Sequence, residues 1–198
     1  MTELFERRDG RWLTVDAYNE IGGAMGALTR RATDIYNGLK ESQQALVRQM
    51  FLRLVTLGEG TEDTRRRVAM TELLSLDFDT EAVQEIIDEF AKYRLLTLDR
   101  DPITRNPTVE VAHEALIRQW QLLRQWLDTN RDGLRIQRRV AAATTEWQNM
   151  GRDNSFLASG MRLTQFEEWI KATELATTES DRDYIQKSIA EHDRLDKE

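Results

Sequence analysis

The chain has 198 residues, of which 40% are hydrophobic and 32% are charged, and it contains no cysteine. This composition is typical of a folded, helix-rich protein and excludes a disulfide framework, a thiol nucleophile and a thiolate metal site. The formal net charge of −7 argues against binding to nucleic acid or to an anionic membrane, because both need a positively charged surface. The absence of cysteine fits a cytoplasmic protein, and no apolar run approaches the roughly 18 residues of a membrane span.

Residues 1–39 are predicted to be the C-terminal part of a preceding helical segment. Residues 2–8 have helical character and no secretory apolar region, and we expect this start to lie inside a longer protein. An extended piece at 11–15 and a short helix near Tyr18 follow. The glycine-rich run 22–27 is interpreted as a loop before a helix over 24–39. It is not a phosphate-binding loop, because Gly26 is followed by alanine and leucine instead of the Lys-Ser/Thr of a Walker motif.

Residues 40–112 are predicted to form a winged-helix domain. A helix from Ser42 ends at the turn 58–60, a short helix spans 70–76, and a third helix begins at Asp79 or Thr80. Its apolar stripe, at helical spacing, is Val83, Ile86, Ile87, Phe90 and Ala91. After Arg94 the period changes to two, and the alternating stretches 96–99 and 108–111 predict a two-stranded β-ribbon. Three helices followed by a ribbon are typical of a winged helix.

Residues 61–67 read as a polar loop that ends in three consecutive arginines. Two interpretations are open: an anion-binding site, or a solvated loop tethered by Glu62 and Asp63. Local charge balance favours the solvated loop.

Residues 113–198 are predicted to form a helical arm. Leu116, Trp120, Leu123 and Leu127 lie on one helical face, and a connector is expected at 130–133. Further helices are predicted at 134–150, 163–175 and 181–195. The tryptophans of this region are interpreted as core residues and not as a base-stacking surface. The predicted fold is thus mainly α: a winged-helix domain of three helices plus a two-stranded β-ribbon, flanked by helical segments.

Catalytic chemistry finds little support in the residues. The chain has two histidines. His192 lies in the last predicted helix, and no other histidine or cysteine stands at ligand spacing from it in the sequence. No glycine-flanked serine marks a nucleophile, and no carboxylate pair stands out from the many acidic residues. We therefore expect no metal site and no catalytic residue.

A DNA-binding transcription regulator of winged-helix type is the main alternative function. The third helix argues against it, because residues 79–94 carry five acidic side chains against one lysine and one arginine. A helix that enters the major groove normally presents arginine, lysine, asparagine or glutamine. A purely structural linker or oligomerisation module is a third possibility.

The junction at His113 and Glu114 is where the second ribbon strand ends and a helix begins. A glutamate in the first helical turn is favoured by about 0.3–1 kcal/mol through the helix dipole. Two interpretations of His113 stay open: a histidine that hydrogen-bonds the local backbone, or one that contacts an anion such as a phosphate from another domain.

At this junction the sequence resembles the helical sensor domain of STAND-class signalling NTPases, whose winged helix ends in a Met-His-Asp signature. Residues 111–118 match that layout, with Ala112 in place of methionine and Glu114 in place of aspartate. The wider chain is similar to the bacterial novel STAND NTPases, in the region between the ATPase core and a C-terminal WD-repeat propeller. The similar stretches are 2–4, 7–10, 21–28, 58–66, 113–117, Trp120, Trp126, 156–157 and 162–163.

The resemblance implies a regulatory role in signal transduction. His113 would contact the β-phosphate of ADP and hold the inactive state, and Glu114 would stand beside it as part of the cofactor-binding site. The Walker A and Walker B residues lie upstream in such proteins, so this chain would not hydrolyse ATP by itself, and ADP or ATP is expected only in the full-length protein. The expected partners are the protein's own upstream ATPase domain and a downstream propeller or effector domain, with no nucleic acid and no membrane.

Overall fold

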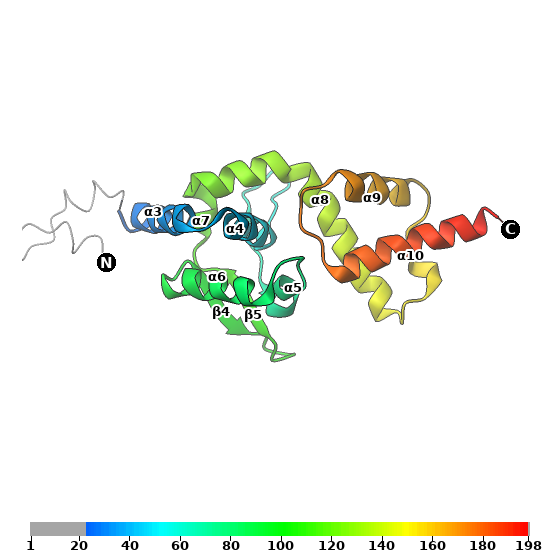
Figure 1. The fold of residues 1–198 in the computed structure, drawn as a ribbon, viewed down its shortest axis with the longest axis horizontal. Helices are drawn as coiled ribbons and strands as arrows, with labels where there is room; N and C mark the ends of the chain where they lie inside the picture. The colour runs from blue at the N-terminus through cyan, green and yellow to red at the C-terminus, as the bar shows by residue number, and fades with distance from the viewer. Residues whose placement is uncertain (1–22, 198) are drawn as a thin grey trace, which may run out of the picture. The chain divides into compact units, whose positions relative to one another are not determined.

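The computed structural model describes residues 23–197, so the helix predicted at 2–8 and the extended piece at 11–15 lie outside the described residues. The described chain is mainly helical with two small antiparallel sheets (Figure 1). It forms two compact units. The first comprises the described residues up to Leu73 together with Thr80–Asp128, and the second comprises Leu74–Asp79 and the residues from Thr129 onward. The proposed domain limits at residues 39 and 112 stay predictions.

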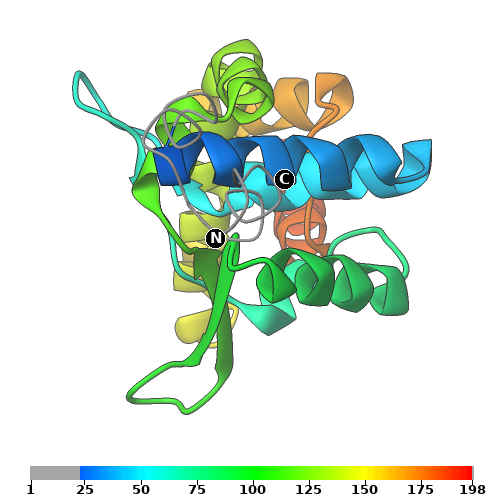
Figure 2. The ribbon, with the colours of Figure 1, turned by 90° about the vertical axis from the view of Figure 1, so that its left-hand side faces the viewer.

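The first unit begins with α3 (Gly23–Gly38), which packs against α4 (Glu41–Arg53) and α7 (Glu114–Gln119), as Figure 2 shows for α3 and α4. The helix predicted over 24–39 is confirmed, whereas the interpretation of 22–27 as a loop is wrong from Gly23 onward. Glycine lowers helix stability by only about 1 kcal/mol per residue, and packing can offset that cost. Here α3 buries Ala32 completely against its neighbours.

Helix α4 ends at Arg53, earlier than the predicted end at Gly58. The chain then forms a small hairpin in which β1 (Val55–Thr56) pairs with β2 (Thr64–Arg65). The glycines at 58 and 60 lie in its loop, and the predicted polar loop 61–67 contains the second strand. Strands of two residues are too short to show an alternating pattern, so only the pairing reveals them.

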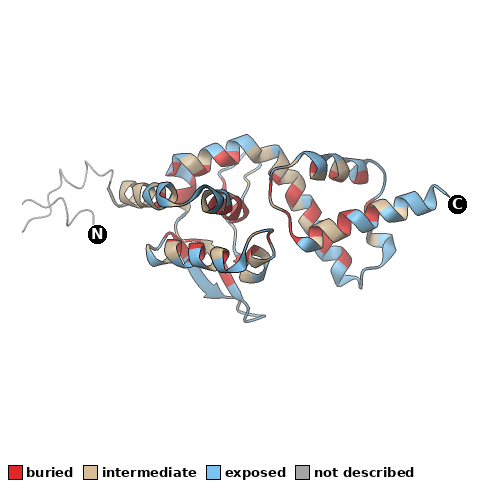
Figure 3. Cartoon of the chain, in the orientation of Figure 1, coloured by how far each residue is buried: buried red, intermediate tan, exposed pale blue. Residues whose placement is uncertain are grey.

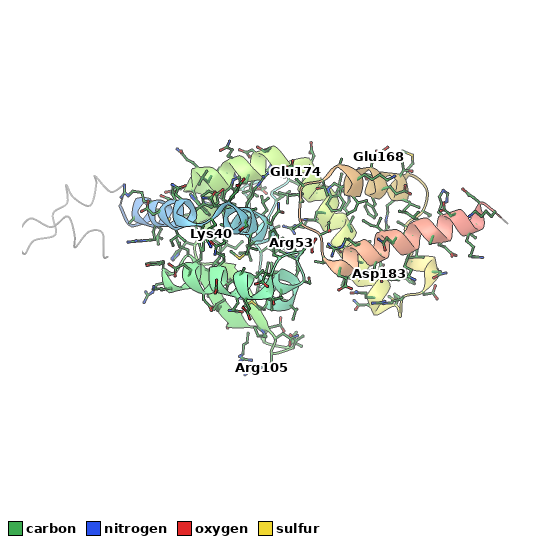
Figure 4. The ribbon with its side chains drawn as sticks, in the orientation of Figure 1. Lys40, Arg53, Arg105, Glu168, Glu174 and Asp183 are labelled. Carbon is green, nitrogen blue, oxygen red and sulfur yellow. The ribbon has the colours of Figure 1, made fainter. Side chains whose placement is uncertain are left out.

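A three-stranded antiparallel sheet follows, with the order β3 (Val68–Ala69), β5 (Pro107–Val111), β4 (Leu96–Arg100). The predicted ribbon of β4 and β5 is confirmed, but the count of two strands is wrong because β3 pairs with β5 on its other edge. In the sequence, the short helix α5 (Met70–Leu74) and α6 (Thr80–Lys92) follow β3 and precede β4. Helix α6 packs against β4. Arg105 lies at the tip of the β4–β5 hairpin (Figure 4).

An aromatic cluster forms the core of the first unit. Trp120 contacts Phe51 at 5.0 Å and Trp126 at 5.4 Å between ring centroids, and Phe51 contacts Phe90 at 5.2 Å. The Trp120 indole N–H donates to the Thr33 hydroxyl at 3.1 Å, which ties α3 to the same cluster. Buried residues accordingly line the inner faces of α4 and α6 in Figure 3. The predicted role of the tryptophans as core residues is confirmed.

Helix α8 (Gln121–Asn149) runs without interruption through the predicted connector at 130–133, and that prediction is wrong. Gly133, which suggested a turn in the sequence, has a different role in the structure. A Cβ atom on Gly133 would lie 3.3 Å from Leu175 Cδ1, so the glycine allows close packing inside the second unit. The actual break lies at Trp120, the C-cap of α7, whose extended backbone separates α7 from α8.

The second unit contains the later part of α8, a short 3₁₀ turn at Asn154–Phe156, α9 (Gly160–Ala172) and α10 (Glu179–Leu195). The helices predicted at 163–175 and 181–195 are confirmed, with shifted ends. Trp147 and Tyr184 pack at 5.7 Å between ring centroids. The Tyr184 hydroxyl donates to the Phe156 carbonyl at 3.2 Å and accepts from Arg162.

Candidate functional site

His113 lies between the end of β5 and the start of α7, as the sequence predicts. Its backbone is extended, with φ −137° and ψ 126°, and its carbonyl accepts the Leu116 N–H at 2.9 Å. The imidazole is exposed and makes no capping hydrogen bond to α7. Within the described part of the chain, the side chain therefore does not serve as a local cap and is left facing solvent.

Glu114, the first residue of α7, is half-buried and engaged within the chain. Its carboxylate lies 3.7 Å from the Arg118 guanidinium one turn along the helix. Arg118 in turn pairs with Glu62 of the β1–β2 hairpin at 2.6 Å. Glu114 thus helps to orient Arg118, whereas the His113 side chain makes no ion pair with any residue in the described range 23–197.

The β1–β2 hairpin lies beside the junction, because β2 packs against α7. It is anchored by Asp63, whose side chain is only 3% exposed and pairs with Arg124 of α8 at 2.8 Å. The other Asp63 oxygen accepts the Gly58 N–H at 2.9 Å, and a Cβ on Gly58 would collide with the Thr61 carbonyl. Sequence reasoning named Asp63 as a tether of the loop but missed its partner Arg124, since 61 positions separate the two residues.

The three consecutive arginines have three different environments. Arg66 donates to both oxygens of Glu72, at 3.0 and 3.1 Å, and to the Arg53 carbonyl. Arg67 lies 3.4 Å from Glu110. Arg65, which is exposed, makes one long hydrogen bond of 3.4 Å to the Ala112 carbonyl and has no ion pair with a described residue. The solvated-loop interpretation therefore fails for Arg66, which is a structural residue, and Arg65 lies next to the junction.

Glu72 accepts from two arginines, since Arg53 also donates to its Oε1 at 2.9 Å. Burial of the carboxyl group by itself raises its pKa. Hydrogen bonds and charge from Arg66 and Arg53 outweigh this effect and hold the pKa of Glu72 below its ordinary value of 4.5. This cluster joins α5 to the last residue of α4 and to the segment between β2 and β3, and the Glu72 carboxylate is ionised near neutral pH.

Other candidate sites find no support in the described residues. His192 is exposed on α10 and lies 3.5 Å from Asp196 on the same helix. No group of three potential metal ligands occurs in residues 23–197. None of the helices described there has both the length and the apolar surface that crossing a membrane requires.

Comparison with known protein families gives a match over most of the chain. A family model described as Novel STAND NTPase 1 matches residues 1–155, a span that includes the whole first unit, the junction and all of α8. No curated protein and no solved structure matches the chain. Because the matched span covers well over half of the 198 residues, the chain belongs to the Novel STAND NTPase 1 family.

Proposed function

We propose that this chain is a regulatory module of a multidomain signalling ATPase. It would couple the nucleotide state of an attached ATPase domain to a downstream sensor or effector domain, without catalytic residues of its own. Membership of an NTPase family supports the link to a nucleotide. The exposed imidazole of His113 at the strand–helix junction is the single observation that carries the proposed role, since this side chain is available to a ligand from outside the chain.

The arrangement of the first unit supports a winged-helix assignment. Three helices, α4, α5 and α6, precede the β4–β5 hairpin, and β3 pairs with β5 to complete a small sheet. This order of helices and strands is that of a helix-turn-helix unit with a β-ribbon wing. The wing would then lead directly into His113, so a displacement of the winged helix would displace the histidine as well.

A phosphate fits the groups present at the junction. An imidazole N–H donates a hydrogen bond in either protonation state and gains strength from a negatively charged acceptor. The Glu114 carboxylate would repel phosphate, and its contact with Arg118 favours an orienting role for it. ADP bound by the ATPase domain would supply the phosphate, and its loss would release the contact. The bound nucleotide would thereby shift the equilibrium between two packing arrangements of the same domains.

The substitution His113→Ala, made in the protein together with its ATPase domain, tests this proposal. A hydrogen bond to a charged group contributes about 1.5–3 kcal/mol, so ADP should dissociate at least about tenfold faster. Release of a fluorescent ADP analogue in stopped flow measures the rate. His192→Ala is the matched control, because that histidine pairs only along its own helix, and it should leave the rate unchanged. Wild-type ADP release in His113→Ala would instead support a purely structural module.

A further inference from the structure

We infer that Arg65 is a second phosphate-contacting residue at the His113 junction, so that the two side chains form a two-point clamp on the β-phosphate of ADP. This inference rests on the proposed function and adds a residue to the same site. It follows from the placement of the β1–β2 hairpin, which brings Arg65 beside the junction at His113.

The geometry places the Arg65 guanidinium directly at the junction. Arg65 belongs to β2, which packs against α7, and its Nη1 donates to the carbonyl of Ala112, the residue immediately before His113. At 3.4 Å this hydrogen bond is long, and a guanidinium has five N–H donors. The side chain is exposed, so most of those donors face solvent and are available to an external acceptor.

The charges around the junction single out Arg65 from its neighbours. Arg66 and Arg67 are directly paired with Glu72 and Glu110. The nearby carboxylates of Glu62 and Glu114 are both directed to Arg118. Arg65 is left with no carboxylate partner among the described residues, and the planar guanidinium fork matches the geometry of a phosphate group.

The hairpin holds Arg65 in a fixed position before any ligand binds. The buried Asp63 carboxylate joins the Gly58 backbone to Arg124 of α8, and β2 is paired with β1 on its other side. A rigid support of this kind lowers the conformational entropy cost of binding, because the backbone of Arg65 is already ordered.

The test uses Arg65→Gln in the protein together with its ATPase domain, with Arg67→Gln as the matched control. Loss of a charge-assisted contact to phosphate should speed ADP dissociation about tenfold in Arg65→Gln and change it little in Arg67→Gln. A phosphate contact also predicts selectivity. The affinity for ADP should fall while the affinity for AMP, which lacks the β-phosphate, stays at the wild-type value. Arg65→Lys, which keeps the charge but not the fork, should give an intermediate rate.

The outcomes separate this inference from the proposed function. If His113→Ala speeds ADP release and Arg65→Gln does not, the Arg65 contact is wrong while the regulatory role stands. If neither variant changes release, both fail. Equal effects of Arg65→Gln and Arg67→Gln overturn the clamp, because they would reflect general electrostatics. Equal losses of ADP and AMP affinity in Arg65→Gln also overturn it, because the residue would then act only by holding the Ala112 backbone.

Discussion

Burial and two arginines have opposite effects on the pKa of the Glu72 carboxyl group. Arg53, labelled in Figure 4, is almost fully buried, whereas Glu72 and Arg66 are each about a quarter exposed. A buried arginine needs a partner, because an unpaired charge in the interior is costly. Glu72 therefore stabilises the first unit by neutralising Arg53, and this contribution depends on its ionisation.

The substitution Glu72→Gln should lower the free energy of unfolding by about 3 kcal/mol at pH 7, the lower end of the range for breaking a buried ion pair. The pKa of Glu72 is lowered in the folded state, so its stabilisation is present above the ordinary value of 4.5 and is lost as the pH falls through the folded pKa. The difference between wild type and variant should therefore shrink towards pH 3. Urea denaturation across this pH range measures it, with the exposed Glu85→Gln as control. A constant difference would contradict the assignment.

At the scale of single elements, α8 carries the largest departure from the sequence-based expectation. The stretch Asn130-Arg131-Asp132-Gly133 resembles a turn in composition, yet it lies within a helix of 29 residues. Local ion pairs favour the helix, since Asp132 pairs with Arg135 at 2.7 Å and Arg124 with Asp128 at 3.1 Å. Packing of Leu134 and Gln137, both almost fully buried, then fixes the helical path.

Asp132→Pro tests whether the helix is continuous. Proline inside a helix removes a backbone donor and clashes with the preceding turn, which costs about 3 kcal/mol or more. In a connector the same change would be nearly neutral. We expect a clear loss of helical circular dichroism and a lower midpoint of thermal unfolding. Asp132→Ala, which removes only the exposed pair with Arg135, should change stability by less than about 0.5 kcal/mol. Equal behaviour of the two variants would contradict a continuous α8.

At the scale of the whole molecule, the sign of the net charge argues against nucleic acid as a partner. The net charge is −7, and the exposed stripe of α6, the helix that would enter DNA in a winged-helix protein, presents Glu81, Glu85 and Asp88. Phosphate would repel this face. The arginines at the hairpin tip, Arg100 and Arg105, are too few to reverse that repulsion.

We therefore predict that the chain does not retard random duplex DNA in a gel-shift experiment, even at low salt. Sequence-independent binding depends on counterion release, so low salt is the condition most favourable to it. A basic winged-helix protein of similar size, run in parallel, is the control. Binding with a steep dependence on salt concentration would favour the transcription-regulator alternative.

The sequence alone determined the helical class, the β4–β5 ribbon and the position of His113. Each depends on local periodicity or on a strand–helix boundary that neighbouring residues encode. Membership of the family was also readable from short motifs spread along the chain. The first residues of α3 and the continuity of α8 were misread, because glycine and polar residues mark turns only where packing does not override them.

The tertiary structure decided what no local pattern contains. The strands β1, β2 and β3 exist only through their pairing, and the Asp63–Arg124 contact joins residues 61 positions apart. Long-range contacts also give the three consecutive arginines different environments. Arg66 and Arg67 pair with carboxylates, and Arg65 lies at the junction. The junction at His113 is encoded by its own sequence, but its neighbour Arg65 is brought there by the fold, because side-chain contacts across distant segments depend on the whole chain's packing.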